Sequence, residues 1–448
     1  MPRLQRRPVA MLSVLTAALV TAVALPARAE NWPQWRGPSG DGVCCESGLP
    51  IAWSEQSGLL WKCPLPEWGT STPAIWGDAI FVTSHEDDQR LLLLRIDKAT
   101  GTIEWTRQVG TGSAPRAPAL RKSPEKRRHQ EFHRTQNLAS PSPVTDGEVV
   151  VAHFGNGDLA AYDFDGRQLW CRNLQKDYGD YTIWWGHANS PVLHQDLVIS
   201  VCMQDSCRDL PGEPSESYVV AHDKRTGMQK WKTLRTTEAT QEHCDAYTTP
   251  IFRQADDDRA GGRLEMVVMG GQVLDAYDPA TGQQSWRLAG LVGNRVIPNP
   301  VAAQGMIYAT QGMSRALLAV SPDGDGEQSR ERIVWQFDQG TSDSPSPVVW
   351  GEHLYFVTIN GIARSLDAQT GQVRWKERLK GEYYASPIAA EGRIYFLNME
   401  GLATVVSASP RFDRLTLNQL DDETIASPAV SDGKLFLRGR KWLYCLGK

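Results

Sequence analysis

The chain has 448 residues, of which 41% are hydrophobic and 22% are charged, and it contains 39 glycines and 27 prolines. This composition is typical of a globular protein with many turns. Its formal net charge of −5 disfavours nucleic acid as a partner, because phosphate binding needs an excess of lysine and arginine.

Residues 1–29 have the pattern of a secretory signal peptide. Three arginines precede an apolar run over residues 9–25, and an Ala-x-Ala motif follows at residues 27–29. An uncleaved membrane anchor is the alternative, but the run is shorter than the ~18 residues that a span needs. Glu30, rather than a lipid-accepting cysteine, follows the cleavage point. We therefore expect an exported protein, periplasmic or secreted, with no transmembrane anchor after cleavage and a net charge of −9 once four arginines are lost.

One sequence unit recurs from residue 71 onward, so we expect an N-terminal segment over residues 30–70 and one domain over residues 71–448. In its complete form the unit begins with Ser/Thr-Pro, contains two apolar runs and ends in Asp-x-x-Thr-Gly-x-x-x-Trp, and the clearest copy extends from Ser346 to Trp375. Asp-x-x-Thr-Gly predicts a hairpin turn, because glycine takes φ > 0 easily and the aspartate side chain can cap the turn.

The prolines that open the units predict the number of blades in a β-propeller. They are Pro73, Pro143, Pro191, Pro250, Pro300, Pro347, Pro387 and Pro428. The last intervals, of 40 and 41 residues, fit four short strands per blade. The eighth unit stops before its fourth strand, whereas residues 58–63 match a fourth strand ahead of the first unit. We predict an all-β, eight-bladed β-propeller of four-stranded blades, with the ring closed by an N-terminal strand that completes the last blade.

Several local features depart from the repeat. In the seventh unit, residues 407–410 replace the usual turn, so its outer hairpin is expected to be degenerate. The acidic run over residues 323–327 has the wrong residues at the sixth and twelfth positions for a calcium loop. His129 and His133 are four residues apart, as metal ligands on a helix are, but they lie in a basic insert that we interpret as a solvated loop.

All eight cysteines lie in the part predicted to be exported, where disulfides persist. They are Cys44, Cys45, Cys63, Cys171, Cys202, Cys207, Cys244 and Cys445. Their spacing leaves two interpretations open, a disulfide framework or small buried hydrophobic residues. Cys202 and Cys207 flank part of an insert that one disulfide could close.

With the Asp-x-x-Thr-Gly-x-x-x-Trp units, the chain resembles the pyrroloquinoline-quinone-like propeller repeat proteins over nearly all of residues 30–448. Residues 31–38 (NWPQWRGP) and 140–147 (SPSPVTDG) are similar to those of exported members from planctomycete-type bacteria. The resemblance implies the fold more than a reaction. The family includes alcohol and glucose dehydrogenases that carry the quinone with calcium, and also an outer-membrane assembly lipoprotein that binds no cofactor.

Three departures separate the chain from those dehydrogenases. Cys44 and Cys45 precede the first repeat, whereas the adjacent cysteines of the enzymes lie over the cofactor. No residue here matches the calcium ligands or the catalytic aspartate of the enzymes, and no Cys-x-x-Cys-His motif is present for a haem. We therefore predict a binding propeller with no identifiable reaction and no catalytic or metal-binding residue. A dehydrogenase using pyrroloquinoline quinone and calcium, for alcohols or sugars, is the alternative, and an envelope assembly scaffold is the second alternative.

A binding site is expected where the loops that precede each Ser/Thr-Pro surround one mouth of the central channel. The candidate ligand-binding residues are Trp68, Arg134, Trp185, His187, Asn189, Asp245, Tyr247, Arg295, Asn299, Asp343 and Tyr384. Rings can stack on a polar ligand, arginine can bind an anionic group, and aspartate can accept hydroxyls or a cation. A quinone, a sugar or a peptide fits this composition, and so does a protein partner. The alternative is that Trp184, Trp185 and Tyr383 only plug the channel.

Overall fold

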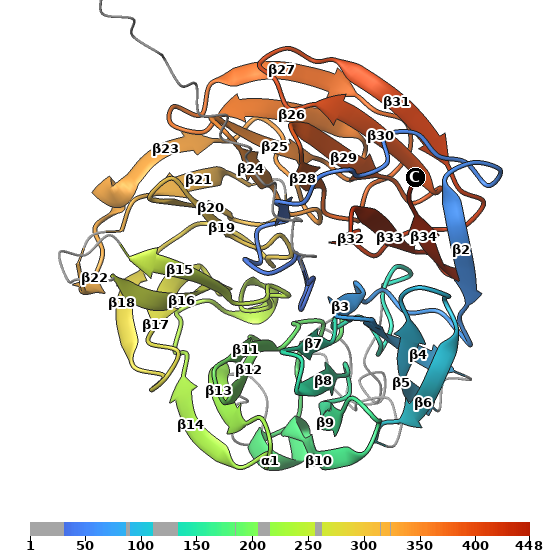
Figure 1. Ribbon diagram of the computed structural model, residues 1–448. Helices are drawn as coiled ribbons and strands as arrows, with labels where there is room; N and C mark the ends of the chain where they lie inside the picture. Colours follow the sequence, from blue (N-terminus) through green and yellow to red (C-terminus); the bar gives the residue numbers. More distant parts are fainter. Residues whose placement is uncertain are drawn as a thin grey trace, which may run out of the picture.

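The computed structural model describes residues 31–86, 90–110, 133–183, 185–204, 216–255, 262–313, 315–322 and 324–448. The predicted signal peptide, Trp184, Cys207 and His129 lie outside these residues. The described chain forms eight β-sheets arranged as blades around a central channel, which confirms the predicted all-β, eight-bladed propeller (Figure 1). No helix within the described ranges is long and apolar enough to cross a membrane.

The eight blades follow one another in chain order, each beginning with its innermost strand. Blade 1 contains β3 (Ala74–Trp76), β4 (Ala79–Glu86), β5 (Arg90–Asp97) and β6 (Ile103–Gln108); blade 2 contains β7 (Val144–Thr145), β8 (Val149–His153), β9 (Asp158–Asp163) and β10 (Gln168–Asn173); blade 3 contains β11 (Val192–His194), β12 (Leu197–Cys202), β13 (Tyr218–Asp223) and β14 (Gln229–Leu234); blade 4 contains β15 (Ile251–Ala255), β16 (Arg263–Gly270), β17 (Val273–Tyr277), β18 (Gln284–Leu288) and β22 (Gly326–Glu327). Blade 5 contains β19 (Val301–Ala303), β20 (Met306–Thr310), β21 (Leu317–Val320) and β23 (Ile333–Phe337); blade 6 contains β24 (Val348–Trp350), β25 (His353–Val357), β26 (Ile362–Asp367) and β27 (Val373–Arg378); blade 7 contains β28 (Ile388–Ala390), β29 (Arg393–Leu397), β30 (Leu402–Ser407) and β31 (Arg414–Gln419); blade 8 contains β32 (Ala429–Ser431), β33 (Lys434–Arg438) and β34 (Trp442–Leu446). One short helix, α1 (Leu174–Tyr178), follows β10.

The eighth blade takes its fourth strand from the N-terminal segment, as predicted. Strand β2 (Leu59–Pro64) pairs antiparallel with β34, with Leu59 opposite Leu446 and Pro64 opposite Trp442. This pairing closes the ring and covers a strand edge that would otherwise be open to another chain.

Tryptophan and glycine of the repeat join neighbouring blades. Gly101 and Gly227 have φ of +72° and +69°, and the carboxylate of Asp97 accepts hydrogen bonds from the backbone N–H and the hydroxyl of Thr100, so the predicted turn is confirmed. Five of these indoles donate to a backbone carbonyl in the turn of the next blade, whereas Trp286 donates to the Glu265 carboxylate of its own blade. The bonds between blades, 2.9–3.1 Å long, come from Trp61, Trp105, Trp170, Trp335 and Trp375.

A hydrogen-bonded belt surrounds the channel at the residue that precedes each opening proline. The backbone N–H of this residue donates to the side-chain oxygen of the equivalent residue in the next blade, over 2.7–3.1 Å; the donors are Thr72, Ser142, Ser190, Thr249, Asn299, Ser346 and Ser386. The hydroxyl of Thr72 donates to the carbonyl oxygen of Ser427 over 3.2 Å and completes the circle. The Ser/Thr of each Ser/Thr-Pro pair therefore links blades.

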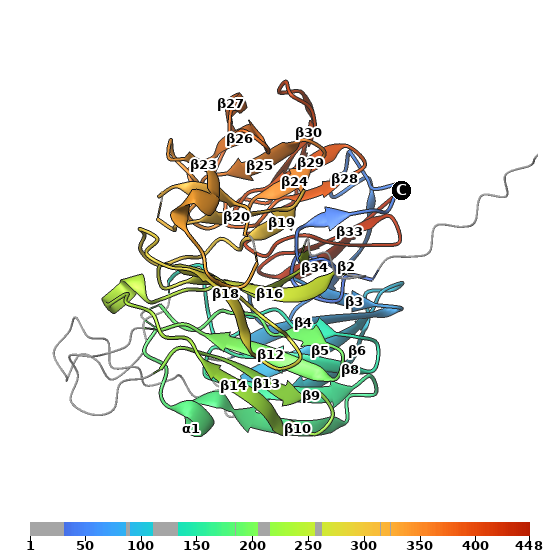
Figure 2. The same cartoon turned by 90° about the vertical axis from the view of Figure 1, so that its left-hand side faces the viewer.

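Residues 31–44 pass through the channel below this belt, which the sequence had not indicated. Trp32 is fully buried and forms a β-bridge with Ile75 of blade 1. The buried Arg36 donates to the carbonyl oxygen of Pro347 in blade 6 over 2.6 Å, and burial lowers its pKa to about 10. Strand β1 (Val43–Cys44) then pairs parallel with β28 of blade 7. The segment, coloured blue, lies toward one face of the ring (Figure 2).

Three sequence features have defined outcomes. The peptide oxygen of Ser409, in the degenerate turn of blade 7, still accepts a hydrogen bond from Trp375 over 3.1 Å. Part of the acidic run forms β22, which pairs parallel with β18 of blade 4, and the carboxylate of Asp325 lies 2.6 Å from the Arg263 guanidinium. Within the described residues, free thiols occur at Cys63, Cys171, Cys202 and Cys445.

Candidate functional site

A cavity of about 470 Å³ opens at the mouth of the channel, above the belt. Every blade contributes the residue three positions before its opening proline to the cavity wall. These residues are Thr70, Ser140, Ala188, Tyr247, Ile297, Ser344, Tyr384 and Ile425. Successive side chains of an extended segment point to opposite sides, so the residues one and three positions before proline face the channel together.

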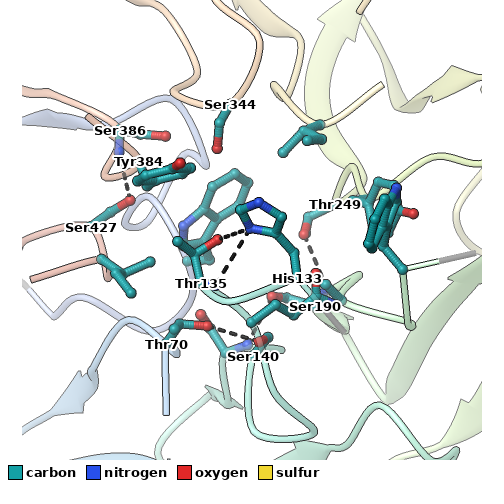
Figure 3. Close-up of a pocket in the computed structure, with 18 of the residues that line it drawn as sticks. Thr70, His133, Thr135, Ser140, Ser190, Thr249, Ser344, Tyr384, Ser386 and Ser427 are labelled. Carbon is teal, nitrogen blue, oxygen red and sulfur yellow. Dashed lines mark hydrogen bonds between the residues drawn. The ribbon is translucent and has the colours of Figure 1, made fainter. Parts of the chain in front are cut away.

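The lower part of the cavity combines belt hydroxyls with one aromatic ring. Five belt residues line it, namely Ser142, Ser190, Thr249, Ser386 and Ser427. Figure 3 shows several of these hydroxyl side chains around the central space. Trp35 also lines the cavity, and it belongs to the segment that passes through the channel below the belt. The N-terminal segment therefore supplies the floor of a pocket whose walls come from all eight blades.

Arg295 and Asp343, the two charged residues of the cavity lining, form a triad with Glu242, which lies outside the lining. The Arg295 guanidinium lies 3.5 Å from the Glu242 carboxylate and 3.7 Å from the Asp343 carboxylate. The Trp185 indole donates to the same Glu242 carboxylate over 3.2 Å. Side-chain exposure of 13–21% for Glu242, Arg295 and Asp343 shows that the triad is half-buried. Arg295 thus lies between two carboxylates and close to an indole ring.

His133 sits against the aromatic side of the mouth. Its ring centre is 6.0 Å from that of Trp185 and 6.3 Å from that of Tyr384, and its Nδ1 lies 2.7 Å from the Thr135 hydroxyl (Figure 3). Burial, with the nearby positive charge of Arg134 and Arg295, lowers the pKa of His133 below its usual value. Its imidazole is therefore neutral at pH 7. Burial also raises the pKa of the neighbouring Tyr384 phenol above its usual value.

The structure brings five of the predicted residues to the cavity and places six elsewhere. Trp185, Tyr247, Arg295, Asp343 and Tyr384 line it. Arg134 is exposed at the rim, where it pairs with Glu382 over 2.7 Å. That any of these residues binds a ligand stays a prediction.

The remaining predicted residues have structural partners in the blade walls. His187 is fully buried and stacks on Tyr181, with ring centres 4.8 Å apart. The amide of Asn189 donates to the carbonyl oxygens of Ala246 and Thr248, over 3.1 and 2.6 Å. Asp245 is fully buried, Asn299 belongs to the belt, and Trp68 lies under the guanidinium of Arg440 at 4.4 Å. None of these five side chains belongs to the lining of the cavity.

The alternative prediction was that Trp184, Trp185 and Tyr383 plug the channel, but another part of the chain closes it. Tyr383 is fully buried in the hydrophobic core between blades 6 and 7. Trp185 contributes to the mouth of the cavity, and residues 31–44 close the channel below it. No feature of residues 31–44 in the sequence identifies their distant partners.

A second hollow, of about 710 Å³, lies beside the rim of the cavity. It is lined by Arg134, Glu382, Met399, Glu400, Gln419, Leu420, Asp421, Asp422, Glu423, Arg440 and Lys441. The carboxylate of Asp422 accepts backbone hydrogen bonds from Lys441 and Trp442, both over 3.0 Å. Asp422 therefore stabilises this loop. Glu382 and Glu423 pair with Arg134 and Arg440 over 2.7 and 2.8 Å, so the hollow keeps only a small excess of acidic groups.

The residues of the cavity do not fit a calcium ion bound with a quinone. Calcium takes six to eight oxygen ligands, including carboxylates. Among the described lining residues, Asp343 is the one carboxylate, and it lies 3.7 Å from the Arg295 guanidinium. The part of the chain that the structure describes contains no group of three His, Cys, Asp or Glu side chains placed to hold a metal ion.

Comparisons with known proteins agree with this architecture. The family model described as outer membrane protein assembly factor BamB matches residues 42–213 and 215–438. A comparison with curated proteins gave no match.

Three solved structures have the same fold. BamB from Moraxella catarrhalis is 13% identical, with a TM-score of 0.57 over 87% of this chain and 97% of that chain. Quinohemoprotein alcohol dehydrogenase from Comamonas testosteroni is 12% identical, with a TM-score of 0.63 over 93% of this chain and 80% of that chain. A europium-containing methanol dehydrogenase is 11% identical, with a TM-score of 0.59 over 91% of this chain and 89% of that chain. At such identities the likeness shows the fold alone.

Proposed function

This chain belongs to the family described as outer membrane protein assembly factor BamB, and its fold is also that of a quinohemoprotein alcohol dehydrogenase. On this basis we propose that it is an exported binding protein. It takes a small polar ligand into the cavity at the mouth of its channel. The observation that supports this proposal is the cavity itself, which has a wall residue from each of the eight blades, a Trp35 floor and a polar mouth. Its volume of about 470 Å³ lies within the range of small-molecule pockets.

The same cavity disfavours the quinone-dependent oxidoreductase as the leading function. A dehydrogenase of that kind needs the quinone and its metal ion at one place, and the donor set around Asp343 does not fit the metal ion. We therefore derive no reaction step for this site.

A protein partner is the second candidate, and one feature favours it. The second hollow carries five acidic side chains beside three basic ones, at the same end of the ring as the cavity. This small excess of acidic groups would attract a partner with a basic surface, and the attraction would weaken as salt increases.

Ligand binding can be tested with a variant that fills the cavity. Ala188 lines the wall, so Ala188→Trp should block the cavity without removing a polar group. The control is Ala280→Trp, at an exposed turn on the outside of blade 4. We would screen the chain from residue 30 against sugars, short peptides, aromatic carboxylates and pyrroloquinoline quinone with and without calcium, using thermal shift and calorimetry. Binding that Ala188→Trp abolishes and Ala280→Trp retains supports the proposal, whereas binding that both variants retain, or none at all, contradicts it.

A further inference from the structure

The two charged groups that line the cavity compensate each other. Arg295 and Asp343 are the charged residues of its described lining, and they lie 3.7 Å apart. Arg295 is also 3.5 Å from Glu242, and His133 is neutral at pH 7 because its pKa is lowered. An anionic ligand would have to compete with two carboxylates for one guanidinium, and a cationic ligand would face that guanidinium. The electrostatics therefore favour an uncharged ligand.

The polar surface of the cavity consists mainly of hydroxyl groups. Aliphatic hydroxyls come from Thr70, Thr135, Ser140, Ser142, Ser190, Thr249, Ser344, Ser386 and Ser427. In the belt, the oxygens of Ser142, Ser190, Thr249, Ser386 and Ser427 accept backbone N–H groups from neighbouring blades. A serine or threonine hydroxyl that accepts such a bond still has a proton to donate. The wall can therefore donate to, and accept from, a ligand that has many hydroxyl groups (Figure 3).

The remaining surface is aromatic or aliphatic. Trp35 comes from the segment that closes the channel, the rings of Trp185, Tyr247 and Tyr384 also line the cavity, and three isoleucines complete the apolar lining. Aromatic faces pack against flat apolar surfaces, such as the C–H face of a pyranose ring, while the ligand's edge remains free for hydrogen bonds. This combination of flat apolar contacts and a polar edge matches a sugar ring.

From these three features we propose that the cavity binds an uncharged saccharide of one or two rings, stacked on Trp35. The inference rests on the proposed ligand-binding function and names the ligand class of the same site. Trp35 is the contact residue that the sequence motif alone did not reveal, because it precedes the repeats.

The test uses a matched series of ligands and two tryptophan variants. Calorimetry and tryptophan fluorescence would be measured with glucose, galactose, mannose, maltose, cellobiose and lactose, and with the charged analogues glucosamine and glucuronate. The variants are Trp35→Ala and, as a control, Trp350→Ala, which lies at the end of β24 away from the belt. Far-UV circular dichroism establishes that each variant is folded, and Ala188→Trp gives an independent block of the cavity if Trp35→Ala does not fold.

We expect at least one uncharged saccharide to bind, and both charged analogues of glucose to bind at least about tenfold more weakly than glucose when glucose binds. Trp35→Ala should weaken binding at least about tenfold, whereas Trp350→Ala should leave it unchanged. If glucuronate, an aromatic carboxylate or the quinone binds in an Ala188→Trp-sensitive manner while every neutral saccharide fails, the saccharide inference is overturned and the binding function stands. If no ligand of either panel binds, both fail.

Discussion

Single residues of the repeat determine how the blades join, and its turn requires glycine for two physical reasons. A Cβ added to Gly227, whose φ is +69°, would lie 2.7 Å from the Trp170 ring of the preceding blade. That indole also donates to the peptide oxygen of Lys224 over 2.9 Å. Glycine is therefore required for its left-handed conformation and for the space that the tryptophan occupies.

A comparison of Gly227→Ala with Gly351→Ala should separate the cost of the left-handed conformation from the cost of the contact with the tryptophan. Gly351 also has positive φ, +56°, but a Cβ there would meet no atom within 4 Å. We expect Gly351→Ala to lower the free energy of unfolding by about 1 kcal/mol and Gly227→Ala by about 2–4 kcal/mol, because the second change adds overpacking. Urea unfolding measures both values. Equal losses would show that the indole does not restrict the turn.

A second residue-scale prediction concerns pH. Burial lowers the pKa of His187 to about 3, whereas an unfolded histidine titrates near 6.5. Below pH 6.5 the unfolded chain binds a proton that the folded chain excludes, so stability is complete above pH 6.5 and falls as the pH decreases toward 3. The loss should reach about 1.4 kcal/mol per pH unit. His187→Phe keeps a ring beside Tyr181. The free energy of unfolding, measured by urea titration at pH 6 and at pH 5, should fall between these two pH values by about 1.4 kcal/mol less in this variant than in the wild type. An equal fall in both proteins would contradict a buried, neutral His187.

At the scale of elements, the blades were predictable from the sequence because their signal is local and repeated. Eight Ser/Thr-Pro-type starts and the Asp-x-x-Thr-Gly turns identified the strands, and the unmatched strand at residues 58–63 revealed the closure by β2. Residues 31–44 carry no such periodicity, and their partners are distant, as the contact of Arg36 with Pro347 shows. Sequence reasoning therefore predicted the ring without the segment that fills its centre.

The cavity, too, was predictable from the sequence where its residues lie near the repeat prolines, but not where they come from a distant segment. Charged and aromatic residues near the prolines suggested the site, which located Tyr247 and Tyr384 but also included His187 and Asn189 in the walls. The wall follows a positional rule instead, since the residue three positions before each proline faces the channel. That rule could be applied to the sequence, whereas the position of Trp35 could not be found without the fold.

Two truncations should separate the roles of the N-terminal elements. A chain beginning at residue 50 lacks the buried Trp32 and β1 but retains β2, so the ring should close and should not aggregate. It should lose at least about 3 kcal/mol of stability, since burial of one large aromatic side chain alone contributes that much. A chain beginning at residue 66 also lacks β2, leaving the β34 edge open, and should aggregate. Sedimentation and thermal unfolding distinguish them, and identical behaviour of both chains would contradict this assignment of roles.

At the scale of the whole molecule, three systems of contacts join the blades into one cooperative unit. The belt connects each blade to the next, and the docked tryptophans do so at the outside. The N-terminal segment adds bonds across the ring, because Trp32 pairs with blade 1, Arg36 with blade 6 and β1 with blade 7. Open repeat arrays have only nearest-neighbour contacts and can unfold from their ends. A closed ring with a central segment has no free end at which unfolding could start at a low free-energy cost.

We therefore expect the propeller to unfold in one transition, although chains of this length often populate intermediates. Far-UV circular dichroism reports on all the strands, whereas tryptophan fluorescence reports on docked indoles such as Trp105 and Trp335. In urea the two probes should give coincident curves for the intact chain, because the outer and inner contacts must break together. In the chain that begins at residue 50, without the contacts across the ring, the curves should separate. Separate curves in the intact chain would show that blades unfold independently and that closure does not make the ring cooperative.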